Sequence, residues 1–226
     1  MRPQLIIALD VDSLAQAQKI VAELGNAIEI FKVGSQLFTA AGSESIKNLQ
    51  AQHKKVFLDL KFHDIPNTVA SAVKAVVHLQ VFMYTLHTVG GKEMMKAAAE
   101  AATQASRDLG VPRPLGVGVT VLTSEARKEN LRDLVLERAS LAKEAGLDGV
   151  VASVEEAGFI RREFGKDFVI VTPGIRPAGT EVGDQKRVAT PAEAVRQGSN
   201  FLVVGRPVLQ ASNPQEAVEK ILAEFG

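Results

Sequence analysis

The chain has 226 residues, of which 46% are hydrophobic, and its 26 basic and 26 acidic side chains give a formal net charge of zero. This length suits one domain with a large core, and the balanced charge argues against a nucleic-acid binder or a membrane-surface protein. The absence of cysteine excludes disulfides, cysteine metal ligands and thiol catalysis. No apolar run reaches the length of a membrane span, and no signal-peptide pattern precedes the first apolar run. We therefore expect a cytoplasmic protein that binds neither nucleic acid nor membranes.

Short apolar runs recur along the chain and are separated by helix signals. Their continuous apolar character is typical of strands that are covered on both faces of a parallel sheet. Capping boxes such as Ser13-x-x-Gln16 mark helix starts between the runs, and glycines such as Gly25 mark helix ends. The eight predicted strands lie at residues 5–9, 28–33, 56–58, 81–86, 115–121, 149–152, 168–171 and 201–204.

The alternation of strands with helices predicts a parallel sheet of the α/β class, and eight such units predict a (β/α)8 TIM barrel. We expect this barrel to form a single domain over residues 1–226. An open doubly wound sheet is the alternative, but the sequence has no N-terminal Gly-x-Gly-x-x-Gly turn to support it.

Polar and charged side chains stand at or just beyond the ends of the predicted strands. In a barrel the carboxyl ends of the strands converge on one mouth, where active sites are built. The residues in these positions are Asp10, Lys32, Asp59, Lys61, His87, Thr123, Arg176 and Arg206. Asp10 alone could be a helix cap, and His87 is better explained as a structural hydrogen-bonding residue, so we leave His87 out of the site. The set as a whole predicts a catalytic site.

The densest group is Asp59-x-Lys61-x-x-Asp64, which follows the third apolar run and precedes a predicted helix. Asp59 and Lys61 are two residues apart, so on an extended backbone both side chains point to the same face. The alternative is an ion-pair cluster that pins a loop. Because so much charge cannot be buried unpaired inside a strand, its position at a strand-to-helix corner favours a reaction site.

Two further segments add to the predicted site, one as a phosphate-binding turn and the other as a lid. Gly205-Arg206 follows the eighth strand, and in barrels the loops after strands 7 and 8 often hold phosphate on backbone N–H groups. Arg206 would add a bidentate cation. Residues 178–186 contain two glycines and few apolar anchors, which predicts a mobile lid, although an ordinary exposed loop would have the same composition.

The extended motif Asp59-x-Lys61-x-x-Asp64-Ile65-Pro66-x-Thr68 resembles the signature of the orotidine 5′-monophosphate decarboxylase family, and the resemblance runs through nearly the whole chain. It implies conversion of orotidine 5′-monophosphate to uridine 5′-monophosphate (UMP) and CO2, the last step of de novo pyrimidine nucleotide biosynthesis, with no cofactor and no metal. It also implies a homodimer in which each subunit supplies its Asp64 to the other subunit's site. The implied catalytic residues are Lys61, as the proton donor to the C6 carbanion, with Asp59, Asp64 and Lys32.

The resemblance also implies a set of substrate-binding residues. Asp10 matches the family's ribose-binding acid, Thr123 its pyrimidine contact, and Arg176 and Gln185 its phosphate loop. The full implied set is Asp10, Lys32, Asp59, Thr68, Thr123, Arg176, Gln185, Gly205 and Arg206. The segment Val81-Phe82-Met83-Tyr84 departs from the family, in which a more polar approach to the histidine is expected.

Decarboxylation leaves an electron pair at C6 of the pyrimidine, which has no attached electron sink. With neither a Schiff-base context nor a metal cluster evident in the sequence, stabilisation must come from preorganised charge, with Lys61 beside the developing carbanion. The required barrier reduction is on the order of 20 kcal/mol. Alternation of Lys32, Asp59, Lys61 and Asp64 pairs each lysine with an acid and favours the charged forms.

Two alternative functions remain open. The 3-keto-L-gulonate 6-phosphate decarboxylases and hexulose phosphate synthases share Asp-x-Lys-x-x-Asp but use magnesium, and they carry a glutamate where this chain has Lys32. A lysine cannot ligate magnesium, which demands oxygen ligands, so Lys32 favours the metal-free reaction. A non-catalytic phosphate-binding barrel is the alternative from another class, but it would not need four charges at its mouth.

Overall fold

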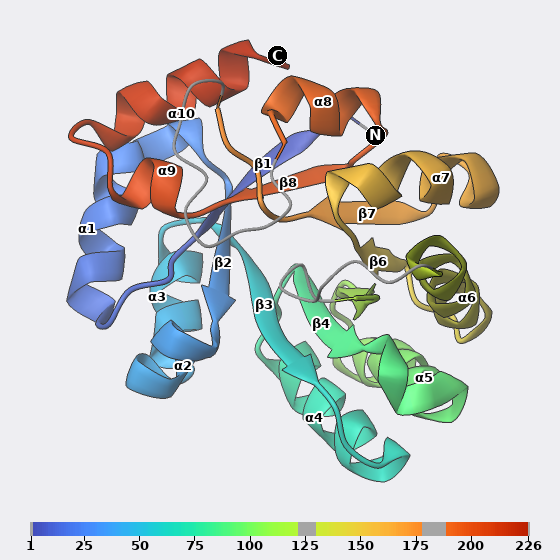
Figure 1. Ribbon diagram of the computed structural model, residues 1–226. Helices are drawn as coiled ribbons and strands as arrows, with labels where there is room; N and C mark the ends of the chain where they lie inside the picture. Colours follow the sequence, from blue (N-terminus) through green and yellow to red (C-terminus); the bar gives the residue numbers. More distant parts are fainter. Residues whose placement is uncertain (1, 122–129, 178–188, 226) are drawn as a thin grey trace.

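The computed structural model describes residues 2–121, 130–177 and 189–225. In this part of the chain, eight parallel strands close into a barrel in sequence order, and helices surround it (Figure 1). The strands are β1 (Gln4–Ala8), β2 (Ile30–Gly34), β3 (Lys55–Phe62), β4 (Met83–His87), β5 (Leu115–Val119), β6 (Gly149–Val151), β7 (Val169–Thr172) and β8 (Phe201–Val204). Pairing of β1 with β8 closes the sheet, so the predicted TIM barrel is confirmed.

The helices begin and end at the signals that the sequence carries. Ser13 accepts the N–H of Gln16 at the start of α1, Thr190 and Glu193 form a capping box at α8, and Asn213 caps α10. The described helices are α1 (Leu14–Leu24), α2 (Ser35–Ala41), α3 (Glu44–Ala51), α4 (Pro66–His78), α5 (Gly91–Leu109), α6 (Leu131–Glu144), α7 (Val154–Phe164), α8 (Pro191–Arg196), α9 (Arg206–Leu209) and α10 (Pro214–Ala223), with two 3₁₀ turns, η1 (Gly25–Ala27) and η2 (Thr88–Gly90). None of the helices in the described ranges has the length and apolar character that crossing a membrane requires.

The core has two layers, as strands that are covered on both faces require. The outer layer packs the strands against the helices, and the inner layer fills the barrel. The inner layer consists of Ile6, Ala8, Ile30, Phe57, Met83, Val117, Val169, Val171, Phe201 and Val203. Burying each larger member contributes about 1.5–3 kcal/mol relative to exposure. Because side chains fill the interior, the site can form only at the mouth.

Strand β3 departs from a regular ladder close to its end. It pairs with β4 at Leu58↔Tyr84 and again at Phe62↔Leu86, and the register shifts in between. Lys61 lies inside this shift with φ +52°, in the left-handed region. Strand alternation, which predicts Asp59 and Lys61 on one face, therefore does not describe the backbone at Lys61. Their side chains meet all the same, through the contact described below.

Candidate active site

A cavity of about 270 Å³ opens at the carboxyl ends of the strands. Seven of the predicted site residues line it: Asp10, Lys32, Asp59, Lys61, Arg176, Gly205 and Arg206. Asp64 and Thr68, by contrast, are exposed on the loop after β3 and in the first turn of α4, and they do not line this cavity. Thr123, Gln185 and the predicted lid at 178–186 lie outside the described residues. The fold thus brings the predicted residues at the strand ends together around one cavity.

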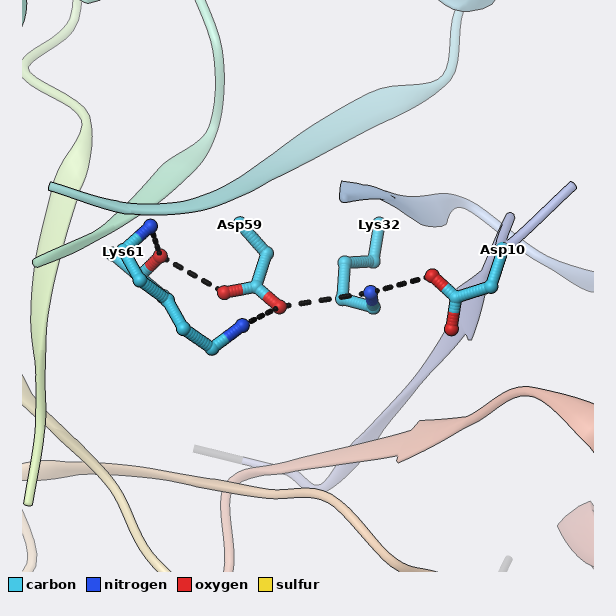
Figure 2. Close-up of polar contacts among 5 residues, drawn as sticks. Asp10, Lys32, Asp59 and Lys61 are labelled. Atoms are coloured by element: carbon cyan, nitrogen blue, oxygen red, sulfur yellow. Dashed lines mark hydrogen bonds and ion pairs between the residues drawn. The ribbon is translucent and has the colours of Figure 1, made fainter. Parts of the chain in front are cut away.

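Four alternating charges form a continuous row along β1, β2 and β3 (Figure 2). Lys32 Nζ lies 2.9 Å from Asp10 Oδ1 and 3.6 Å from Asp59 Oδ2. Lys61 Nζ lies 2.8 Å from the same Asp59 oxygen. The side chains at the centre of the row, Lys32 and Asp59, are 11% and 12% exposed, whereas Lys61 and Asp10 are 36% and 50% exposed. The two ends of the row are therefore the parts that a ligand can reach.

Asp59 is the acid shared by both lysines. Burial raises the pKa of its carboxyl, but the positive charges of Lys32 and Lys61, with hydrogen bonds from Lys61 and Thr85, outweigh burial and leave the pKa below its usual value. Asp59 is therefore a carboxylate at neutral pH. Its negative charge holds the two ammonium groups together at the mouth.

Two residues of this site were missed by the sequence reasoning. Thr85, on β4, donates its hydroxyl to Asp59 Oδ1 at 2.9 Å and accepts the N–H of Lys61 at 2.9 Å. Gly34, at the end of β2, leaves open the space above its Cα, where a Cβ would lie 2.9 Å from Lys32 Nζ and 3.3 Å from Asp10 Oδ1. Strand alternation could have indicated both positions, because residues two apart on a strand share a face. Thr85 stands two residues before His87, and Gly34 stands two residues after Lys32.

The wall opposite the charged row is apolar and ends in cations. Val119, Val151, Val171 and other small apolar groups line it from β5, β6 and β7. Arg176 follows β7 and is buried, and Gly205-Arg206 follows β8. The cavity therefore offers alternating charges on one side, an apolar surface on the other, and two guanidinium groups where β7 and β8 end. This arrangement suits a ligand with a flat ring and a phosphate group.

His87 stands beside the site without lining the cavity. Burial, followed by the positive charges of His63 and Lys61, lowers the pKa of its imidazole, and the rings of His63 and His87 lie 5.7 Å apart. A lowered pKa favours the neutral imidazole at pH 7. Among the described residues, no three His, Asp or Glu side chains lie close enough to one another to hold a metal ion.

Residues 3–221 match the family model described as "Orotidine 5'-phosphate decarboxylase / HUMPS family". The chain belongs to this family. An orotidine 5′-phosphate decarboxylase of Moorella thermoacetica is 48% identical over 233 residues, covering 99% of this chain and 92% of the relative. One of Legionella pneumophila is 46% identical and covers 100% of both chains.

The fold of the family agrees with the structure. The crystal structure of orotidine 5′-phosphate decarboxylase from Lactobacillus acidophilus superposes with a TM-score of 0.87 at 40% identity and covers 100% of both chains. The corresponding structure from Pyrococcus horikoshii OT3 has a TM-score of 0.81 at 26% identity, with 98% of this chain and 99% of the other covered. The family resemblance expected from the sequence motif is confirmed.

Proposed function

We propose that this protein decarboxylates orotidine 5′-monophosphate to UMP and CO2, and that Lys61 protonates C6 without help from a cofactor. The observation that carries the proposal is the row of four charges, which presents Lys61 Nζ to an otherwise largely apolar cavity that two arginines also line. Full-length relatives that bear the decarboxylase name support the reaction class. A phosphate-binding barrel with no catalytic role would leave this row without a purpose.

The reaction leaves one electron pair on C6 and moves one proton to it. The bond between C6 and the substrate carboxyl breaks, CO2 leaves, and the bonding electron pair stays on C6. The ammonium of Lys61 stabilises that pair as it develops and then transfers a proton to C6, which leaves a neutral amine that regains its proton from water. Asp59 holds Lys61 in place, 2.8 Å from Nζ, so little reorganisation is needed when the charge forms.

The remaining residues bind parts of the substrate that do not react. Arg176, Gly205 and Arg206 would hold the phosphate, and Asp10 the ribose. Binding energy from these remote groups can be used to force the substrate carboxylate against the charged row. This use of binding energy fits the large barrier reduction, on the order of 20 kcal/mol, that the reaction needs.

Lys32 separates this proposal from the magnesium-dependent alternative. Its ammonium lies between Asp10 and Asp59, at 2.9 and 3.6 Å, in the position where the magnesium-dependent relatives carry a carboxylate. A cation there repels a divalent metal and supplies no oxygen ligand. We therefore expect activity to survive exhaustive chelation.

The test is CO2 release from orotidine 5′-monophosphate, measured with and without chelator. The expected result is equal release in both, and its loss in Lys61→Ala. Arg196→Ala, an exposed arginine of α8 outside the cavity, is the matched control and should retain activity. No release from orotidine 5′-monophosphate, together with magnesium-dependent consumption of 3-keto-L-gulonate 6-phosphate, would establish the alternative.

We further propose that Asp64 completes the site of a neighbouring subunit in a homodimer. Asp64 is exposed and does not line the cavity of its own chain, and its carboxylate accepts the N–H of Ile65 at 2.6 Å. Ile65 itself is 66% exposed, which is unusual for a large apolar side chain and suits an interface. In a two-fold dimer each subunit would give its Asp64 to the other.

Complementation tests this arrangement. Lys61→Ala and Asp64→Ala homodimers should each be nearly inactive. In a mixed dimer one site carries both lesions and the other carries neither, so about a quarter of all sites should recover after random exchange. Co-expression allows the exchange. If mixed dimers form and no activity returns, Asp64 acts within its own subunit and the shared site is wrong.

A further inference from the structure

The backbone of Lys61 is in an unusual conformation for a residue inside a strand. Three non-glycine residues in the described ranges have positive φ, namely His53, Lys61 and Gln80. His53 and Gln80 lie in turns that follow helices, and Lys61 lies within β3. A left-handed conformation is unfavourable for a residue with a Cβ, and it persists where the surrounding structure holds it. Some contact must therefore support Lys61.

The pairing of β3 with β4 locates that support. Between Leu58↔Tyr84 and Phe62↔Leu86, the three residues 59–61 of β3 stand opposite the single residue Thr85. The strand therefore bulges, and a bulge of this kind redirects a side chain while disturbing the ladder. Thr85 Oγ1 accepts the N–H of Lys61 at 2.9 Å, so a side chain meets a backbone group within the bulge.

The same hydroxyl also reaches the acid of the site. Thr85 Oγ1 donates its only proton to Asp59 Oδ1 at 2.9 Å, while Lys61 Nζ contacts the other carboxylate oxygen, Oδ2, at 2.8 Å. One buried hydroxyl thus ties the backbone of Lys61 to the carboxylate that holds its side chain. Thr85 is 0% exposed and does not line the cavity, so it reaches the substrate only through these two partners.

We propose that Thr85 is a positioning residue, which fixes the left-handed backbone of Lys61 and the carboxylate of Asp59 for proton transfer. This inference rests on the proposed decarboxylation and extends it. Valine matches threonine in shape but can neither donate nor accept, so Thr85→Val leaves the Lys61 N–H and one Asp59 oxygen without this partner. Serine keeps the hydroxyl and loses a methyl group.

Three variants test the proposal. Thr85→Val removes the hydroxyl, Thr85→Ser restores it, and Thr88→Val is the matched control. Thr88 is also buried and its hydroxyl donates to the carbonyl of Val119 at 2.8 Å, but it has no contact with the charged row. We expect kcat to fall about 10- to 100-fold in Thr85→Val, the range for an unsatisfied buried polar group, and to stay near wild type in the other two variants.

Further measurements separate positioning from a general loss of structure. The affinity for UMP should change little in Thr85→Val, because phosphate and ribose contacts lie elsewhere. The acid limb of kcat/KM should move to higher pH, because Asp59 loses a hydrogen bond that lowers its pKa. The Lys61 amide hydrogen should exchange faster with solvent, which NMR measures without any turnover.

Failure of the proposed function and failure of the positioning role of Thr85 would give different results. A wild-type protein that releases no CO2 refutes the proposed function itself. If wild type is active and Thr85→Val equals Thr88→Val in kcat and in Lys61 amide exchange, the positioning role is wrong. If Thr85→Val does not fold, Thr85→Ala tests the same loss without the buried methyl groups. Failure of both to fold while Thr88→Val folds would assign Thr85 to barrel stability and overturn the proposal.

Discussion

The two ends of the barrel use the same kinds of charged residue in different ways. At the amino end, before β5 and β6, Arg113 Nη1 contacts both carboxylate oxygens of Asp148 at 2.9 Å, and Asp148 also accepts the N–H of Gly116 at 2.8 Å. At the mouth, two lysines share one oxygen of Asp59. The pair at the amino end has its partners within the chain and lines no part of this cavity, whereas the row at the mouth ends in groups that face it. We infer that charge at the amino end serves stability and charge at the mouth serves chemistry.

The strongest test of this contrast is Lys61→Ala, which should abolish turnover while the barrel remains folded. Loss of this ammonium removes the proposed proton donor, but Asp59 keeps Lys32 as a partner 3.6 Å away. CO2 release and urea unfolding measure the two effects separately. Comparable turnover in the variant would remove Lys61 from the mechanism.

Arg206→Ala should lower kcat/KM by about 10- to 100-fold, the range for one charge-assisted contact. The expected loss is in substrate capture, because Arg206 follows β8 and the row that would contact C6 lies just after β1 and on β2 and β3. Steady-state kinetics check this, with Arg196→Ala as the control. An unchanged kcat/KM would place the phosphate elsewhere.

Gly34→Ala should lower turnover by about tenfold, the effect of weakening one charged hydrogen bond, and should barely change the free energy of unfolding. The new Cβ would come within 2.9 Å of Lys32 Nζ, and the end of a flexible lysine side chain can move away at small cost in stability. Its displacement would lengthen the contact with Asp10. Ser35→Ala, at the exposed next position, is the control. Equal kinetics in the two variants would show that the place of Lys32 is not critical.

Arg113→Ala should have the smallest effect on turnover and a clear effect on stability. Removing the arginine partner of Asp148 should lower the free energy of unfolding by about 1–3 kcal/mol. The control is Lys47→Ala, which breaks an exposed pair with Glu44 and should cost less than about 1 kcal/mol. Thermal unfolding and CO2 release are the measurements. Lost activity in a folded Arg113→Ala protein would contradict the division between the two ends.

The sequence could predict the barrel and most of the row because both depend on local patterns. Apolar runs mark the strands, and the charges after them meet because parallel strands end at one mouth, as Asp10, Lys32 and Asp59 do. The family assignment is confirmed by the match over residues 3–221. The roles of these residues, the dimer and the cytoplasmic location stay predictions.

The remaining features depend on contacts between strands, and alternation along one strand marks the position of Thr85 without showing what its hydroxyl binds. The left-handed backbone at Lys61 is not predictable from the sequence, because the position is not a glycine. The hydroxyl that accepts the Lys61 N–H belongs to Thr85 on the next strand, where it follows an apolar stretch. Strand β4 begins at Met83, two residues later than its apolar run suggests. A register shift of this kind is set by pairing between strands, so the sequence of either strand alone does not contain it.

Closure of the barrel through β1 and β8 has a consequence for the newly made protein. Gln4 pairs with Phe201 and Ile7 with Val204, so one edge of the first strand stays unpaired until residues almost 200 positions later have been synthesised. At synthesis rates of about 5–20 residues per second, that interval is roughly 10–40 s. During this interval the edge of β1 that later pairs with β8 has no partner strand, and this edge is open to association with other chains. Only closure brings Ala8 and Asp10 beside Gly205, so in a nascent chain the two sides of the cavity meet in this late step.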